Sequence, residues 1–333
     1  MSSSSVARMP AGQAGTQGET PWVVIGLDVG GSRLKGALLR SDGTLVGDVR
    51  QADARSGEPK EVVLSTFTGM IQSLMAGAGD MQVAGIGIAM PGPFDYERGI
   101  SYIRGLGKYE ALYGINVGEA LRDRLGLDRS FPVRFLNDAE AFARGEWRFG
   151  AARGRRRVMV LTFGTGCGSA FLADGKVLRG GPGVPPDGYV YGIPFRGATI
   201  DDWLSARGIL RLWQGRRGGG AQVPAGVQVK DLAARAEAGD AEARALFREF
   251  GWMAGEALRP IAAAFQPDCI VIGGGISKGY ALFGPQLVEA LGEWGAVVTP
   301  ATHPDEAAVL GAATLVLELA SSRPSVRRPI GRG

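Results

Sequence analysis

A strand, a glycine turn and a second strand follow one another twice in this chain. In the first copy, the apolar run 23–28 leads into Val29-Gly30-Gly31-Ser32 and a strand over 34–39. In the second, the run 158–162 leads into a glycine turn at 163–166 and a strand over 168–172. Both copies continue through an Asp-Gly turn into a third short strand. A repeat of this kind predicts two related α/β domains that face each other across a cleft.

The remaining periodicity supplies the other elements of two such domains. Apolar residues at helical spacing predict helices over 58–75 and 240–265, although Pro260 is expected to kink or interrupt the second one. Glycine and arginine crowd the segment 211–228, which predicts a mobile surface loop. Further elements are expected as strands over 83–90, 131–136 and 269–272 and as helices over 137–148 and 306–319.

The chain is expected to form two domains between two tails. An N-terminal α/β domain spans 22–136 and is completed by the helix at 306–320, a C-terminal α/β domain spans 137–305, and disordered tails cover 1–21 and 321–333. The first twenty residues are rich in Ser, Ala, Gly and Gln and lack the apolar core of a signal peptide. No apolar run is long enough to cross a membrane, so we expect a cytoplasmic protein without a membrane partner.

Charge and residue counts argue against several function classes. The formal charge of +4 comes from 37 Lys and Arg against 33 Asp and Glu, and four arginines lie in the tail at 321–333. The folded body is therefore near neutral, which argues against a nucleic-acid partner. The chain has two cysteines, Cys167 and Cys269, and one histidine, His303. These counts fit a reducing compartment and argue against a zinc site.

Glycine makes up 54 of the 333 residues, more than twice the usual share of roughly 7%. No turn matches the G-x-x-x-x-G-K-[ST] or G-x-G-x-x-G nucleotide fingerprints. The two strand–turn–strand copies could be ordinary hairpins, or their backbone N–H groups could form nests for phosphate. Two copies in paired domains favour the nests. Gly273, Gly274 and Gly275 are either a strand–helix turn or a flat wall for a nucleotide base or ribose.

Asn137 and Asp138 stand where a strand meets a helix. One interpretation is structural, because Asn137 with Glu140 fits a capping box and Asp138 favours the helix dipole. The other places Asp138 at the mouth of the cleft, where its carboxylate could take a proton from a substrate hydroxyl.

Together these segments resemble the ROK family of sugar kinases and repressors. The resemblance runs from about 23 to 319 and is most specific at 26–32, 90–93, 137–141 with 145–146, 161–168 and 272–277. It implies two duplicated ribonuclease-H-like (actin-like ATPase) α/β domains around an interdomain cleft, and a homodimer. It also implies ATP and Mg²⁺ as cofactors, with Asp138 as general base and Asn137 as a sugar ligand. The implied nucleotide ligands are Asp28, which positions Mg²⁺ through water, and Gly30, Gly31, Ser32, Lys35, Thr165, Gly166, Gly273, Gly274 and Gly275.

The segment after the second turn departs from the family. Many members carry Glu-x-Gly-His there, followed by a Cys-rich zinc loop, whereas this chain has Tyr189 and Gly192 in place of the Glu and the His. Replacing two groups that grip sugar hydroxyls should change what is bound, so glucose specificity is not favoured. The available substitutes are Asp187, Tyr189, Tyr191, Arg196 and Asp202, although the two tyrosines could merely pack the loop.

An ATP-dependent carbohydrate kinase that acts on a small-molecule sugar is the favoured function. A catalytically degenerate sensor or regulator on the same scaffold is the alternative, because the sugar loop is altered. A structural protein of the actin superfamily fits least well, and too few residues precede the first strand for the DNA-binding domain of family repressors. The identity of the sugar and the choice between ATP and polyphosphate as donor stay open.

Overall fold

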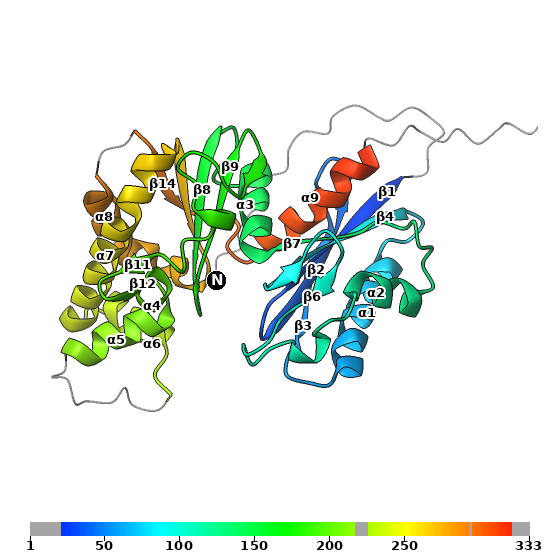
Figure 1. The fold of residues 1–333 in the computed structure, drawn as a ribbon, viewed down its shortest axis with the longest axis horizontal. Coiled ribbons are helices and arrows are strands. Elements are labelled where there is room, and N and C mark those ends of the chain that lie inside the picture. The colour runs from blue at the N-terminus through cyan, green and yellow to red at the C-terminus, as the bar shows by residue number, and fades with distance from the viewer. Residues whose placement is uncertain (1–20, 217–225, 293–294, 322–333) are drawn as a thin grey trace, which may run out of the picture.

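The computed structural model describes residues 21–216, 226–292 and 295–321 and has two lobes side by side (Figure 1). Each lobe is built on a five-stranded mixed sheet, with strand orders β3-β2-β1-β4-β7 and β10-β9-β8-β13-β14. In both sheets the first three strands in sequence pair in antiparallel fashion. The last two strands are parallel to the first strand and extend the sheet on its other side. The two sheets therefore share one topology, which confirms the predicted repeat and the α/β fold class.

The first lobe follows the predicted elements closely. Its sheet consists of β1 (Trp22–Val29), β2 (Arg33–Arg40), β3 (Leu45–Asp53), β4 (Gln82–Met90) and β7 (Val133–Asn137). Its helices are α1 (Lys60–Gly77) and α2 (Val117–Leu125), and the short β5 (Phe94–Asp95) and β6 (Ile100–Ser101) form a hairpin after β4. Alternate residues of β1 face opposite sides of the sheet. Val23, Ile25 and Leu27 pack in the core that includes α1, whereas Val24 packs in a second core on the other side.

The second lobe is larger and carries more helices. Its sheet consists of β8 (Arg157–Phe163), β9 (Cys167–Ala173), β10 (Lys176–Leu178), β13 (Cys269–Gly273) and β14 (Val297–Pro300). Its helices are α3 (Asp138–Phe149), α4 (Ile200–Trp203), α5 (Ala206–Arg216), α6 (Val229–Glu237), α7 (Ala241–Phe265) and α8 (Tyr280–Leu291), with a β11 (Pro194–Phe195) and β12 (Ala198–Thr199) hairpin. No helix in the described part of the chain is long and apolar enough to cross a membrane.

The closing helix α9 (Ala307–Ser321) returns from the second lobe to lie on β1 and β4 of the first, against α3 (Figure 1). Glycines allow this close approach. A Cβ on Gly87 of β4 would lie 1.9 Å from the carbonyl oxygen of Ala312, and one on Gly311 would lie 1.7 Å from that of Ala141 in α3. The excess of glycine therefore serves backbone-to-backbone packing as well as turns. The proposed domain boundaries themselves stay a prediction.

A buried carboxylate fixes the segment that leads into α9. Glu146 near the end of α3 is fully buried and accepts hydrogen bonds from the amides of Ala151 (2.7 Å), Thr302 (3.0 Å) and His303 (2.7 Å). The ring Nε2 of His303 lies 3.2 Å from the carbonyl oxygen of Phe149. The chain's one histidine therefore belongs to this crossing and not to the sugar loop.

Two expectations about helices were wrong in part: Pro260 does not interrupt its helix, and part of an expected loop is helical. Helix α7 runs uninterrupted for 25 residues through Pro260, because proline removes one backbone hydrogen bond while Leu258 and Ile261 keep the helix anchored in the core. The segment 211–216, expected within a mobile loop, belongs to α5, where Trp213 is buried. The rest of that expected loop up to 225 lies outside the described residues.

Candidate active site

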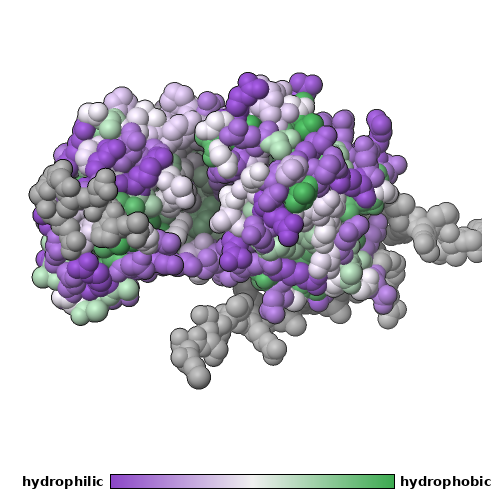
Figure 2. All heavy atoms as spheres, turned by 90° about the horizontal axis from the view of Figure 1, so that it is seen from below, coloured by the Kyte–Doolittle hydropathy of each residue, from purple (hydrophilic) through white to green (hydrophobic). Residues whose placement is uncertain are grey.

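The surface is hollowed between the two lobes (Figure 2). Strands β1, β4 and β7 run parallel, and their register pairs Asp28 with Ala89 and Met90 with Asn137. The carboxyl ends of parallel strands meet at one sheet edge, which is where ligands bind in open α/β folds. Asp28 and Asp138 are therefore brought to the same edge of the sheet.

The two carboxylates are close enough to influence each other. Burial raises the pKa of Asp28 to about 6, and the negative charge of Asp138 adds to the rise whereas Lys35 opposes it. Asp138 keeps a solvent-exposed face, but protein surrounds the rest of its side chain, and this desolvation raises its pKa. The amide of Ala139, which lies 2.9 Å from Asp138 Oδ1, and the charge of Lys108 oppose that rise.

This pair fits a hard divalent cation. Mg²⁺ is bound through a few carboxylates together with water and substrate phosphates, and Asp28 with Asp138 supplies two carboxylates beside a glycine turn. A bound cation would favour the charged forms and lower both pKa values. Within the described residues, no group of three or more His, Cys, Asp or Glu side chains could form a closed metal cage.

The first glycine turn is rigidly supported. The Gly30 amide donates to the carbonyl of Arg33 (2.9 Å), and the Tyr109 hydroxyl donates to the carbonyl of Gly30 (2.6 Å). Ser32 and Gly31 are exposed at its tip. Lys35 follows on β2, opposite Asp28 in register, and its ammonium donates to the backbone carbonyl of Asp305 (2.6 Å).

The second glycine turn and the Gly273–Gly275 segment are in direct contact. Gly274 has φ +80°, and a Cβ there would lie 2.4 Å from the carbonyl oxygen of Phe163, so only glycine fits. Gly275 is exposed to open space, whereas a Cβ on Gly273 would overlap the ring of Phe142. In the turn itself, Thr165 is exposed and the Gly164 amide donates to the carbonyl of Gly166 (2.9 Å). The structure thus places two of the predicted nucleotide segments side by side.

Asn137 caps α3 as predicted. Its Oδ1 accepts from the amides of Ala139 (2.9 Å) and Glu140 (3.4 Å), and its Nδ2 donates to the Tyr96 hydroxyl (3.2 Å). The expected capping box with Glu140 is not formed. Glu140 is almost fully buried and instead receives two hydrogen bonds from the guanidinium of Arg179, each 2.7 Å long. A bidentate ion pair stabilises the charge of a buried carboxylate better than one backbone amide can.

The altered sugar loop brings Tyr189 toward the carboxylates. Its ring centroid lies 5.4 Å from that of Tyr191, which is half exposed. Burial raises the pKa of Tyr189 to about 12, and the negative charge of Glu140 contributes. Asp138 also acts on Tyr189 and on Tyr96, so these side chains share one environment.

Three other substitutes from the loop are placed differently. Asp187 is exposed at a turn with φ 55°. Arg196 pairs with Glu256 of α7 (2.5 Å) and lies 5.4 Å over the ring of Phe195, so its guanidinium is already engaged by another carboxylate. Asp202 forms a capping box with Thr199 at the start of α4.

Sequence reasoning missed three polar side chains near the predicted ligands. They are Tyr96, which hydrogen-bonds Asn137; Arg179, which pairs with Glu140; and Asp201, whose Oδ1 accepts from the Cys167 amide (2.6 Å) in the second turn. Of these three residues, only Arg179 had a signal in the sequence that could have marked it as a site residue, because it lies between an expected strand and two glycines.

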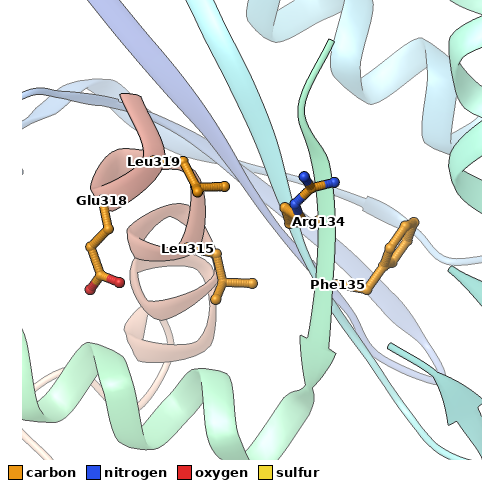
Figure 3. A pocket seen from close by; sticks show the side chains of 5 residues that line it. All are labelled: Arg134, Phe135, Leu315, Glu318 and Leu319. Carbon is orange, nitrogen blue, oxygen red and sulfur yellow. The ribbon is translucent and has the colours of Figure 1, made fainter. Parts of the chain in front are cut away.

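A separate pocket of about 330 Å³ lies between α9 and the edge strand β7. Leu315 and Leu319 point from α9 toward β7, which contributes Arg134 and Phe135, and Glu318 completes the lining (Figure 3). None of the predicted ligands lines it, so it plays no part in the candidate site.

Asp28→Asn is expected to stabilise the protein at pH 8 by about 1–3 kcal/mol in the absence of Mg²⁺ and nucleotide. A carboxyl whose folded pKa of about 6 exceeds its unfolded value of 3.8 contributes stability at low pH, and this stability is lost as the pH rises through 6. The advantage of the variant should therefore shrink between pH 8 and pH 5 in thermal unfolding. The exposed Asp48→Asn serves as control, and a variant advantage that is equal at both pH values would contradict the assignment.

The chain is similar to proteins of one known family. The model of the ROK family matches residues 24–319. A glucokinase of Thermotoga maritima is 29% identical over 321 residues, which cover 89% of this chain and 97% of that protein, and an N-acetylmannosamine kinase of Escherichia coli is 27% identical over 87% and 97%. The crystal structure of a ROK family glucokinase from Streptomyces griseus, in complex with glucose and AMPPNP, has a TM-score of 0.69 at 25% identity and covers 88% of this chain and 98% of that one.

Proposed function

Because the chain belongs to the ROK family, we propose that it is a carbohydrate kinase that transfers the γ-phosphoryl group of ATP to a sugar hydroxyl. The observation that carries this proposal is the position of Asp138. Its carboxylate lies at the carboxyl-terminal edge of the first sheet, where its charge acts on Asp28, Tyr96 and Tyr189. Relatives named as glucokinase and N-acetylmannosamine kinase support this class of reaction.

Asp138 accepts the proton of the attacking hydroxyl. Its Oδ1 is oriented by the Ala139 amide, and Asn137 also hydrogen-bonds the carboxylate. Burial raises its pKa, which makes it a stronger base than an ordinary carboxylate. Asn137 and Tyr96 fix the start of α3, so the base is held on a rigid element.

The phosphates of ATP lie against the two glycine turns, and the adenosine lies on the wall formed by Gly273, Gly274 and Gly275. The backbone amides near Gly30 and Gly166 donate to phosphate oxygens as charge develops. Asp28 would hold Mg²⁺ through water, and Lys35 balances the charge of this carboxylate. When bound, the cation would neutralise charge on the transferred phosphoryl group.

The sugar is bound by a set of groups that differs from the Glu and His of the family. Tyr189 and Tyr191 offer stacking area with polar tips, and the Arg179–Glu140 pair presents a fixed polar surface beside them. A hexose or an N-acylated hexose is the expected substrate, and glucose specificity is not favoured. The homodimer and the domain boundaries given above remain part of this proposal.

A nucleotide- and sugar-binding sensor is the second candidate, and it rests on the loss of the Glu-x-Gly-His groups. The experiment that separates the two is a phosphorylation panel of hexoses, N-acetylhexosamines and sugar phosphates with ATP and Mg²⁺, in which ADP release is measured. Turnover of one sugar supports the kinase. Calorimetric binding of nucleotide and sugar without turnover of any panel member would support the sensor, and turnover only with polyphosphate would change the donor.

A further inference from the structure

Helix α5 begins directly against the second glycine turn. The amide of Ala206, its first residue, donates to the carbonyl of Gly164 (2.8 Å). The hydroxyl of the preceding Ser205 is fully buried and has no hydrogen-bond partner among the described residues. The wall residue Gly274 packs on Phe163 at the same turn. The turn therefore contacts both the predicted nucleotide wall and the start of α5.

The carboxylate of Asp201 contacts this turn and forms an ion pair with Arg207. Asp201 accepts from the Cys167 amide (2.6 Å), and a Cβ on Gly166 would lie 2.8 Å from the same Oδ1, so this carboxylate touches the turn's backbone. Its other oxygen, Oδ2, pairs with the Nη2 of Arg207 in the first turn of α5. The Arg207 side chain is 61% exposed, and its guanidinium has five N–H donors, more than the pair with Asp201 uses.

The charges of Asp201 and Arg207 indicate what this pair can bind. A carboxylate at a phosphate-binding turn repels phosphate unless a cation compensates it, and a guanidinium oriented by a carboxylate keeps donors for a second partner. We propose that Arg207 binds the phosphates of the nucleotide at the second glycine turn, with Asp201 as its positioning residue. This inference rests on the proposed function, because it assigns a further ligand to the same nucleotide.

Arg207→Gln is expected to weaken the binding of AMP-PNP·Mg²⁺ by about tenfold or more, because a charge-assisted contact is lost and Asp201 is left uncompensated. Binding of adenosine, which has no phosphate, should be unchanged. The matched control is Arg211→Gln, one helical turn further along α5, where the guanidinium lies 4.9 Å over Trp203. Calorimetry on the full chain, with thermal unfolding to check the fold, measures both ligands.

A double variant tests the role of Asp201. Asp201→Asn keeps an acceptor for the Cys167 amide but no longer holds Arg207, so it should weaken AMP-PNP·Mg²⁺ binding by less than Arg207→Gln does. The double variant should bind better than the product of the two single losses predicts, because it removes the uncompensated charge. A purely structural role for the pair would weaken adenosine binding equally.

The failure of this inference is distinguishable from that of the proposed function. If the wild-type protein binds AMP-PNP·Mg²⁺ and Arg207→Gln binds it equally well, or if adenosine binding falls in parallel, only the role of Arg207 is overturned. If the wild-type protein binds no nucleotide, the donor assigned under the proposed function is overturned, and the role of Arg207 with it.

Discussion

Asp138→Asn is expected to lower kcat of the carbohydrate kinase by about 10²–10⁴ while leaving substrate affinity within a few-fold of wild type. Asparagine keeps the shape and can still accept from the Ala139 amide, but it cannot take the hydroxyl proton. The loss should therefore appear in kcat and not in KM. Initial rates of ADP release on the best sugar of the panel measure it.

The control for this substitution is Asp240→Asn. Asp240 also stands at a helix start, where it accepts from the Ala243 amide (3.0 Å), and asparagine is an equally good N-cap. This variant should keep wild-type kcat. If Asp138→Asn keeps most of its turnover as well, Asp138 is not the general base.

Gly311→Ala is expected to destabilise the protein by about 3 kcal/mol or more, which corresponds to a fall of roughly 6 °C or more in Tm. The added Cβ would lie 1.7 Å from the carbonyl oxygen of Ala141 and 2.8 Å from the amide nitrogen of Gly145. Both are backbone atoms of α3, so relief requires that one helix moves away from the other. Thermal and urea unfolding followed by circular dichroism measure the change.

Gly69→Ala is the matched control for that variant. Gly69 is exposed in α1, and an added Cβ would meet nothing within 4 Å. Alanine is the better helix former, so this variant should gain about 0.5–1 kcal/mol. Equal stability changes in the two variants would show that close packing between α3 and α9 does not limit the choice of residue at Gly311.

The repeat was predictable because each copy consists of local sequence patterns. Each copy places an apolar run, a glycine turn and an Asp-Gly turn in sequence, and β1-β2-β3 and β8-β9-β10 follow from these directly. The position of Asp138 at a strand–helix junction was predictable for the same reason. Local pattern predicted that Asn137 caps α3. It did not predict that the same side chain also donates to the Tyr96 hydroxyl.

Contacts between distant segments could not be predicted. Arg179 reaches Glu140 across 39 positions and Asp201 reaches the Cys167 amide across 34, and neither spacing belongs to a local motif. The role of the glycines under α9 was not predictable either, since composition does not reveal that Gly87 faces the carbonyl of Ala312. Helix α7 persists through Pro260 because tertiary packing outweighs a local propensity.

The return of α9 to the first lobe has a consequence for synthesis on the ribosome. Val24, Ala37 and Leu39 of the first sheet are buried against Val309, Ala313 and Val316 of α9, which are translated long after β1 and β2. While the second lobe is being made, this face of the first sheet lacks its cover. The nascent chain therefore carries an apolar surface that chaperones can bind until residues 307–321 leave the exit tunnel.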